Sequence, residues 1–160
     1  MSLRLRPTTE KDLPFVVRIE SEAAATRFVS SQTRGEHEDY LADSNVRHLI
    51  IENEEKPIGY VILLGLNDAN ENVEFRRVVI AEKGKGYGRQ AVRLIKKIAF
   101  AELNAHRLWL DVKDFNTRAR RLYETEGFVA EGVWRECEKN GDARESLVFM
   151  SILRSEFENE

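Results

Sequence analysis

Apolar and polar positions alternate with two different periods in the N-terminal part of the chain. Residues 3–5 alternate leucine with arginine, which predicts a short strand, and Pro7 ends it. Residues 9–12 have the composition of a helix start, and the apolar residues that follow them keep a helical spacing. Residues 21–36 have only a weak pattern. A second short helix is predicted over about residues 36–41.

The middle of the chain contains three apolar runs separated by polar turns. Residues 49–51 and 73–80 predict strands, and residues 58–66 predict a longer strand that is apolar on both faces. A strand of this kind is expected at the centre of a sheet. Residues 54–57 and 67–70 have turn composition. Together these features predict an antiparallel meander.

A helical period appears in the second half of the chain. Apolar residues from Ala91 to Ala99 recur at the spacing of an amphipathic helix. Residues 108–112 alternate as a strand. A second helix is predicted over residues 116–126, with Asn116 as its N-cap and Gly127 in the left-handed conformation that ends it.

The C-terminal part predicts strands. Residues 128–131 form one, and residues 133–153 form two around Asn140 and Gly141, a pair that favours a type I′ hairpin turn. The last strand, residues 147–153, fits pairing within one subunit and pairing across a homodimer. No repeat or linker interrupts the pattern, so residues 1–160 are expected to form a single domain. The element order β-α-α-β-β-β-α-β-α-β-β predicts a mixed α/β fold.

Composition excludes several classes of protein. The chain has 160 residues, 42% of them hydrophobic, which is enough for a buried core and too much for a disordered chain. Its one cysteine, Cys137, excludes a disulfide scaffold, and we expect a structural role for it. The longest apolar run, residues 60–64, is far short of the roughly 20 residues that span a bilayer. Residues 1–7 have no apolar signal segment. We therefore expect a soluble, cytoplasmic protein with no membrane partner.

Basic residues are concentrated in one part of the chain. Residues 76–121 contain 13 Lys and Arg against four acids, although the net charge of the whole chain is −3. A basic segment within an acidic chain predicts an anionic ligand held locally. A solvated, charged helix face is the alternative.

A glycine-rich loop with three basic residues separates the predicted strand 73–80 from the helix that follows it. Alternate glycines let successive N–H groups point into one concavity, and the N-terminus of the helix adds the positive end of its dipole. The loop consists of Lys83, Gly84, Lys85, Gly86, Tyr87, Gly88 and Arg89. It predicts a binding site for phosphate groups, with an ordinary glycine-rich turn as the alternative.

Two common phosphate-binding loops do not fit these residues. A Walker A loop needs Gly-Lys-Ser/Thr, which is absent. Residues 86–91 match the dinucleotide pattern G-x-G-x-x-A, with Asp111 placed as the ribose-binding acid. However, the strand before the loop belongs to an antiparallel meander, and fewer than 50 residues follow Asp111. A doubly wound sheet cannot be completed there.

Two motifs resemble the GNAT N-acetyltransferase superfamily. The pattern R/Q-x-x-G-x-G/A matches residues 83–88, with Lys83 in the first position. The pattern N-x-x-A-x-x-L-Y-x-x-x-G-F is matched at every position by Asn116, Ala119, Leu122, Tyr123, Gly127 and Phe128. The chain is similar to ribosomal-protein-type and spermidine-type enzymes, least so in residues 21–45. The resemblance implies a central, mostly antiparallel mixed sheet of about seven strands flanked by about four helices.

The resemblance also implies an activity. It implies acetyl-CoA as the donor and a primary amine as the acceptor (a polyamine, another small amine or a protein N-terminus), with direct attack of the amine. The alternative is a non-catalytic CoA-binding or regulatory module with the same fold. The anionic CoA accounts for the basic segment, so we expect no nucleic acid; Phe100, Trp109 and Phe115 are equally explained as core residues.

Individual roles follow from the resemblance. Tyr123 is implied as the acid for the departing thiolate, with a packed core tyrosine as the alternative. Glu74 is implied as the base, with Glu71 as a fallback and an exposed strand carboxylate as the alternative. The cofactor is implied to contact the glycine-rich loop, Asn116 and the main chain of Val78, Val79 and Ile80. Arg118 and Arg121 are expected either to contact phosphate groups of the cofactor or to lie in solvent on the helix surface.

The strand from Glu74 to Ile80 departs from the family pattern by one extra residue, which predicts a shifted bulge.

The remaining polar residues give weaker indications. His37, His48 and His106 have no ligand spacing, so no metal is expected. His37 is expected on the surface, either beside the acceptor cleft or simply in solvent. The acidic remainder of the chain, including Glu36, Glu38 and Asp39, favours a cationic acceptor.

Overall fold

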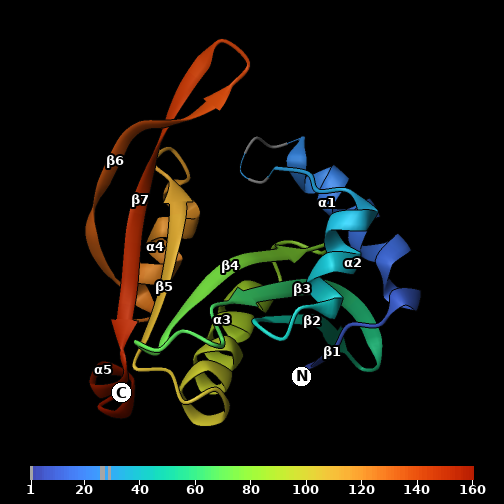
Figure 1. Cartoon of the computed structure of the whole chain (residues 1–160), viewed down its shortest axis with the longest axis horizontal. Coiled ribbons are helices and arrows are strands. Elements are labelled where there is room, and N and C mark those ends of the chain that lie inside the picture. Colours follow the sequence, from blue (N-terminus) through green and yellow to red (C-terminus); the bar gives the residue numbers. More distant parts are fainter. Residues whose placement is uncertain (1, 26–27, 29) are drawn as a thin grey trace.

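The computed structural model describes residues 2–25, 28 and 30–160, which form a seven-stranded sheet with helices on both faces (Figure 1). The strands are β1 (Leu3–Pro7), β2 (Val46–Asn53), β3 (Lys56–Leu64), β4 (Asn72–Ile80), β5 (Arg107–Lys113), β6 (Val129–Asn140) and β7 (Ala143–Leu153). The helices are α1 (Leu13–Ala24), α2 (Arg34–Ala42), α3 (Tyr87–Lys97), α4 (Thr117–Thr125) and α5 (Arg154–Glu158), with short turns of helix at Glu10–Asp12 and Ile98–Glu102.

The sheet has the order β1-β2-β3-β4-β5-β7-β6. Every neighbouring pair is antiparallel except β4 and β5, which confirms the predicted meander and the mostly antiparallel mixed sheet. The parallel pairing is short, because it joins only Asn72–Glu74 to Arg107–Trp109. Beyond these residues the two strands separate, as Figure 1 shows. We call the stretch in which β4 and β5 no longer pair the strand gap.

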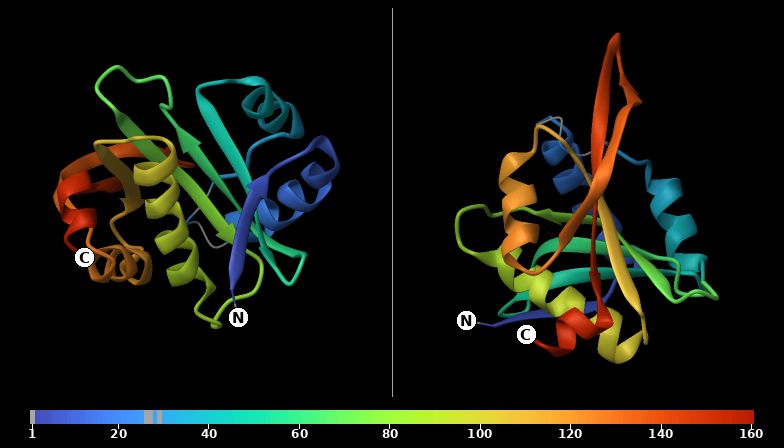
Figure 2. Two further views of the ribbon diagram at one scale, coloured as in Figure 1. Left: turned by 90° about the horizontal axis from the view of Figure 1, so that it is seen from below. Right: turned by 90° about the vertical axis from the view of Figure 1, so that its left-hand side faces the viewer.

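Helices cover the two faces of the sheet at different places (Figure 2). The larger core cluster packs α3 residues such as Ile95 against β3, β4, β5 and β7. A smaller cluster packs α1 residues such as Val16 against Tyr60 and Ile62 of β3. The predicted central strand is therefore buried on both faces, and its residues 60–63 have no exposed surface.

The C-terminal hairpin differs from the prediction in two respects. Residues 128–131 and the first hairpin strand form one long strand, β6, because bulges after Ala130 and Trp134 absorb the irregular pattern. The two central residues of the turn are Gly141 and Asp142, and only Gly141 has a positive φ, of 62°. This is the pattern of a type II′ turn, so the type I′ prediction was wrong. β7 pairs with β5 and β6 on its two edges, which confirms pairing within one subunit.

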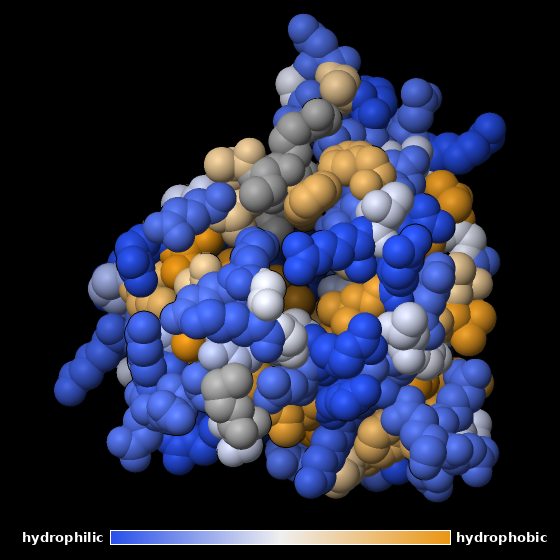
Figure 3. Space-filling view, turned by 180° about the vertical axis from the view of Figure 1, so that it is seen from behind, coloured by the Kyte–Doolittle hydropathy of each residue, from blue (hydrophilic) through white to orange (hydrophobic). Residues whose placement is uncertain are grey.

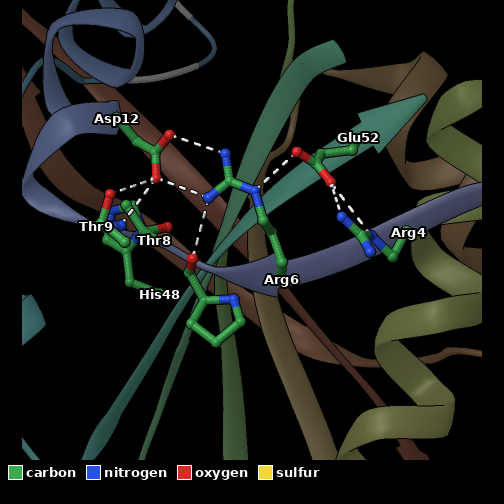
Figure 4. A network of polar contacts seen from close by, with 8 residues as sticks. Arg4, Arg6, Thr8, Thr9, Asp12, His48 and Glu52 are labelled. Atoms are coloured by element: carbon green, nitrogen blue, oxygen red, sulfur yellow. Dashed lines mark hydrogen bonds and ion pairs between the residues drawn. The ribbon is translucent and has the colours of Figure 1, made fainter. Parts of the chain in front are cut away.

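The N-terminal strand is fastened by an arginine network (Figure 4). Arg6 places Nη1 2.8 Å from Oδ2 of Asp12 and Nε 2.8 Å from Oε2 of Glu52. Arg4 places Nη2 2.6 Å from the other oxygen of Glu52. The hydrogen bond from Arg6 lowers the pKa of Asp12 to about 2. The network joins β1, β2 and the start of the first helix.

The molecular surface is mainly hydrophilic on the side shown in Figure 3, with small apolar patches between charged side chains. In the described part of the chain, no helix is long and apolar enough to cross a membrane.

Candidate active site

The edge of β4 that faces the strand gap offers free main-chain groups. The N–H of Ala81 donates to the carbonyl of Ile58 (2.7 Å), and β3–β4 pairing continues in this register from Ile80 to Arg77. Hydrogen bonding alternates along an antiparallel ladder. The N–H and C=O groups of Val79 therefore point to β3, whereas those of Val78 and Ile80 point into the gap. Of the three predicted main-chain contacts, two face the gap.

The predicted bulge in β4 is confirmed. Leu63 pairs with Phe75 and Ile62 pairs with Arg77, so Arg76 is the extra residue. Phe75 packs in the core with α3, whereas the side chain of Arg77 reaches α1 on the opposite face. The bulge thus turns two successive arginines toward the α1 face.

Two glycines of the glycine-rich loop are exposed and have open space around them. Gly84 and Gly86 have φ values of 77° and 74°, which glycine adopts without the cost that a Cβ would bring, and no atom lies within 4 Å of a Cβ built at either position. Gly86 is the N-cap of α3, so the first N–H groups of that helix open toward the loop. A Cβ on Gly88 would lie 3.6 Å from Leu122, and this glycine sits where α3 packs close to α4.

The other loop residues divide into exposed cations and anchors. Lys83 and Lys85 are exposed, and Lys85 lies 2.7 Å from Glu82. Tyr87 is buried, and its hydroxyl accepts a hydrogen bond from Nδ2 of Asn53 (3.1 Å). Arg89 binds Oε2 of Glu126 at 2.6 Å. The side chains of Tyr87 and Arg89 therefore hold the loop and α3 in place.

Many basic residues of segment 76–121 form ion pairs within the fold. Among the pairs that the described residues form, Arg89, Arg93 and Lys96 contact Glu126, and Lys113 contacts Glu138 and Glu145. Lys83, Arg118 and Arg121 have no ion pair or hydrogen bond within the described residues. These cations remain for an anionic ligand or for solvent.

Tyr123 of α4 lies at the other side of the gap. Its ring packs against Phe75 (5.9 Å between centroids) and Phe128 (5.7 Å). Burial, with a smaller contribution from the negative charge of Asp111, raises the pKa of Tyr123 to about 12. The hydroxyl is therefore protonated at neutral pH. Asn116 caps this helix, since its side-chain oxygen accepts from the N–H of Ala119 (3.3 Å).

Three charged side chains gather where β4 and β5 separate. Glu74 forms the last pair of the ladder with Trp109, and Asp111 lies two residues further along β5. Arg76 places Nη1 3.3 Å from Oε2 of Glu74. Burial raises the pKa of both Glu74 and Asp111, and the charge of Arg76 opposes both shifts. Asp111 acts electrostatically on both Glu74 and Tyr123, the predicted base and acid.

The sequence indicated Asp111 only as a ribose-binding acid and did not predict its position beside Glu74. The available signal was its polar position in the alternating strand 108–112, one strand from Glu74.

Several expectations about other residues need correction. His37 is fully buried between α2 and the sheet and not on the surface. Phe115 is 40% exposed and Trp109 is only half-buried, so of the three aromatics that were equally explained as core, only Phe100 lies there. Cys137 is exposed on β6.

The role of Glu71 as the alternative base stays a prediction. Its main-chain carbonyl accepts from the N–H groups of His106 and Arg107, and these hydrogen bonds close one end of the β4–β5 pair.

Within residues 2–25, 28 and 30–160, no group of three or more His, Cys, Asp or Glu residues is arranged to hold a metal ion.

Comparison with known proteins agrees with this geometry. A family model described as "Acetyltransferase (GNAT) domain" matches residues 2–129. The spermidine N(1)-acetyltransferase of Escherichia coli K12 is 26% identical over 155 residues, covering 91% of this chain and 83% of that protein. The spermidine N(1)-acetyltransferase of Vibrio cholerae is 34% identical over 95 residues, covering 58% of this chain and 55% of that protein.

Solved structures match nearly the whole chain. The crystal structure of the spermidine N-acetyltransferase from Vibrio cholerae in complex with CoA and spermine has a TM-score of 0.88 and 28% identity, and 99% of each chain is covered. A chimera of that enzyme and hSSAT has a TM-score of 0.90, 29% identity and complete coverage of both chains. The strand gap, the glycine-rich loop and these matches lead to one conclusion: the chain belongs to the GNAT acetyltransferase family and transfers the acetyl group of acetyl-CoA to an amine.

Proposed function

We propose that the acceptor is the primary amine of a small cationic molecule of the polyamine type, and that it attacks acetyl-CoA directly at the strand gap. The observation that carries this proposal is the position of Glu74 and Tyr123 around the free edge of β4, with Asp111 acting on both. Two carboxylates at the gap attract a protonated amine and would repel an anionic acceptor. The similarity to spermidine acetyltransferases supports the same class.

The residues that line the gap fit CoA. Val78 and Ile80 offer main-chain groups with which the amides of the pantetheine arm pair as a neighbouring strand would. Lys83, Lys85 and the N–H groups of Gly84, Gly86 and Gly88 would face the pyrophosphate, because Gly84 and Gly86 have open space around them and the loop lies at the N-terminus of α3. Asn116 stands at the start of α4, where its side chain already serves as a cap. Bound there, acetyl-CoA supplies the thioester that the amine attacks.

Side chains of the protein accept and donate the protons that the reaction transfers. Glu74 accepts the protons that the acceptor nitrogen loses as the ammonium becomes an amide, and passes them to water. The nitrogen–carbon bond forms while the carbon–sulfur bond breaks. Tyr123 donates to the departing sulfur, which leaves as the thiol, and recovers its proton from water. The N–H groups of Val78 and Ile80 at the open edge are available to polarise the thioester carbonyl.

The test is an acceptor screen. The protein is incubated with acetyl-CoA and spermidine, 1,4-diaminobutane, an aminoglycoside, free amino acids or a peptide N-terminus, and the free thiol is measured. We expect turnover with the polyamines and little with amino acids, whose carboxylate the gap would repel. Absence of turnover with every amine, together with calorimetric binding of acetyl-CoA, would contradict the proposal and support a non-catalytic CoA-binding module.

A further inference from the structure

Three aromatic rings form a continuous shelf beside the strand gap. Trp109 of β5 stacks on Phe149 of β7 with 5.9 Å between centroids and 19° between planes. Phe149 in turn lies 4.5 Å from Trp134 of β6. Trp109 and Phe149 are half-buried, and Trp134 is 63% exposed. We call these three residues the aromatic shelf.

The aromatic shelf lies on a face that the described helices leave open. α1 and α2 pack chiefly on β2, β3 and β4, whereas α4 lies on the opposite face of β5 and β7 (Figures 1 and 2). Leu110, Val112 and Val148 point to that opposite face and belong to the core. Since side chains alternate along a strand, Trp109, Asp111 and Phe149 share the open face. Asp111 and Phe149 are direct partners in the β5–β7 register.

Asp111 stands between the gap and the aromatic shelf without a partner of its own. It is half-buried, and it forms no hydrogen bond or ion pair with the residues that the structure describes. Arg76, Lys113 and Glu138 act on it only at longer range. A carboxylate removed from water and left unpaired costs free energy that a bound cation recovers. The position therefore favours a ligand with an ammonium group.

We propose that Asp111 binds the ammonium group of the acceptor and that the aromatic shelf binds its apolar stem. The proposal rests on the proposed function, since it assigns residues to the acceptor of that reaction. The expected acceptors are alkylamines and arylalkylamines that carry no carboxylate. A stem that leaves Asp111 toward Phe149 and Trp134 lies on aromatic faces, which bind both methylene groups and a second ammonium group.

The charges around the aromatic shelf agree with this class. Four acids stand on or beside this face: Glu74, Asp111, Glu138 and Glu145. Arg76 and Lys113 form ion pairs with three of them and leave Asp111 unpaired within the described residues. The negative charge of the four acids favours cationic acceptors and disfavours anionic ones.

The first test separates acceptor binding from donor binding. Steady-state kinetics with n-butylamine and 1,4-diaminobutane are measured for the wild type, Asp111→Asn and Asp114→Asn. We expect Asp111→Asn to raise the acceptor KM at least about 10-fold and to leave the acetyl-CoA KM within about 2-fold. Asp114 lies three residues away, is exposed and serves as the matched control. An unchanged acceptor KM in Asp111→Asn, or an equal rise in both KM values, overturns the role of Asp111.

The second test uses the length of the stem. For n-alkylamines from ethylamine to octylamine, kcat/KM of the wild type should rise with each methylene group that reaches the aromatic shelf, by up to about 3-fold per group. In Trp134→Ala, kcat/KM should increase less with stem length for the longer amines. Val133→Ala is the matched control, because Val133 is also exposed and points to the other side of β6. Trp134 is exposed, so this variant does not threaten the fold.

The two tests also distinguish failure of this inference from failure of the proposed function. If the wild type acetylates no amine, the proposed function fails. If amines are acetylated but kcat/KM is independent of stem length, or Trp134→Ala keeps the full rise, the aromatic shelf has no part in binding the acceptor.

Discussion

Two charged clusters lie next to each other along β4, and they differ in how well their acids are paired. In the first, Glu20 of α1 is almost completely buried and accepts hydrogen bonds from the hydroxyl of Tyr60 and the main-chain N–H of Gln32. His37 Nε2 lies 3.1 Å from its carboxylate and Arg77 Nη1 3.0 Å. Burial alone would raise the pKa of Glu20, but these partners outweigh burial and lower the pKa to about 2.

The second cluster, at the strand gap, leaves its acids nearly unpaired. Glu74 has one partner, Arg76, at 3.3 Å, and Asp111 has none within the described residues. Burial therefore prevails, and it raises the pKa of both carboxyl groups. The difference in pairing separates the two kinds of acid. The well-paired Glu20 stabilises the fold, whereas Glu74 and Asp111 are the acids that we propose to serve the substrate.

The first cluster also holds the connection between α1 and α2. Arg77 donates to the carbonyl of Ser30 (2.7 Å) while it contacts Glu20, and Glu20 binds the N–H of Gln32. The first contact fastens Ser30 to β4, and the second fastens Gln32 to α1. These two contacts position the described residues directly before α2.

The largest expected effect is the loss of the buried carboxylate. Glu20→Gln leaves Arg77 buried without its counter-charge, and we expect the free energy of unfolding to fall by about 3–5 kcal/mol. Urea denaturation at pH 7 measures it. Glu22→Gln, an exposed change on the same helix, should stay within about 0.5 kcal/mol of the wild type. A loss below about 1 kcal/mol for Glu20→Gln would contradict the structural role, given the usual cost of breaking a buried pair.

Acid should weaken the same cluster. Burial, with the charge of His37 as a smaller cause, lowers the pKa of His48 from 6.5 to about 4. The folded protein favours neutral His48, so this stabilisation is complete above pH 6.5 and is lost as the pH falls toward 4. We expect a loss of about 3 kcal/mol in the free energy of unfolding over that range. Below pH 4.5, protonation of Glu20 adds a further loss, complete near its folded pKa of about 2.

The measurement is urea denaturation at several pH values between 7 and 4. His48→Gln should flatten the dependence, whereas His106→Gln, a change at an exposed residue, should keep it. A wild-type stability that does not change between pH 7 and pH 4 would show that His48 titrates normally.

At the strand gap we expect loss of activity without loss of stability. Tyr123→Phe removes the hydroxyl and keeps the ring against Phe75 and Phe128, so kcat should fall about 100-fold. The acetyl-CoA KM and the unfolding midpoint should stay close to the wild-type values. If kcat is unchanged, Tyr123 is not the acid.

Of the four effects predicted in this Discussion, that of Glu74→Gln should be the smallest. We expect kcat/KM at pH 7 to fall about 10-fold, because water can accept the proton less efficiently. Wild-type kcat/KM should rise with pH as Glu74 ionises, and its raised pKa places this rise above the ordinary range of glutamate. The pH–rate profile of Glu74→Gln should lack this limb. A limb that persists in the variant would assign it to another group.

Local patterns were enough to predict most of the fold. The positions of β2 to β5, the cap at Asn116 and the left-handed Gly127 depend on neighbours within a few residues, and all agree with the structure. The bulge in β4 was predicted only from the family pattern, from which this strand departs by one residue, and the structure places it at Arg76. The type II′ turn escaped prediction because Asn140 pairs with Ala143 and leaves Gly141 as the first central residue, a register set by the whole hairpin.

The sequence by itself determined the family, the glycine-rich loop and the acid and base candidates, because those features are local and carry recognisable spacing. Only the tertiary structure decided which side chains are paired. It buried His37, exposed Phe115 and placed Asp111 of β5 where its charge acts on Glu74 and Tyr123. The physical reason is that the burial and electrostatic environment of a side chain depend on segments distant along the chain. The spacing of residues within one segment does not determine which distant segments pack against it.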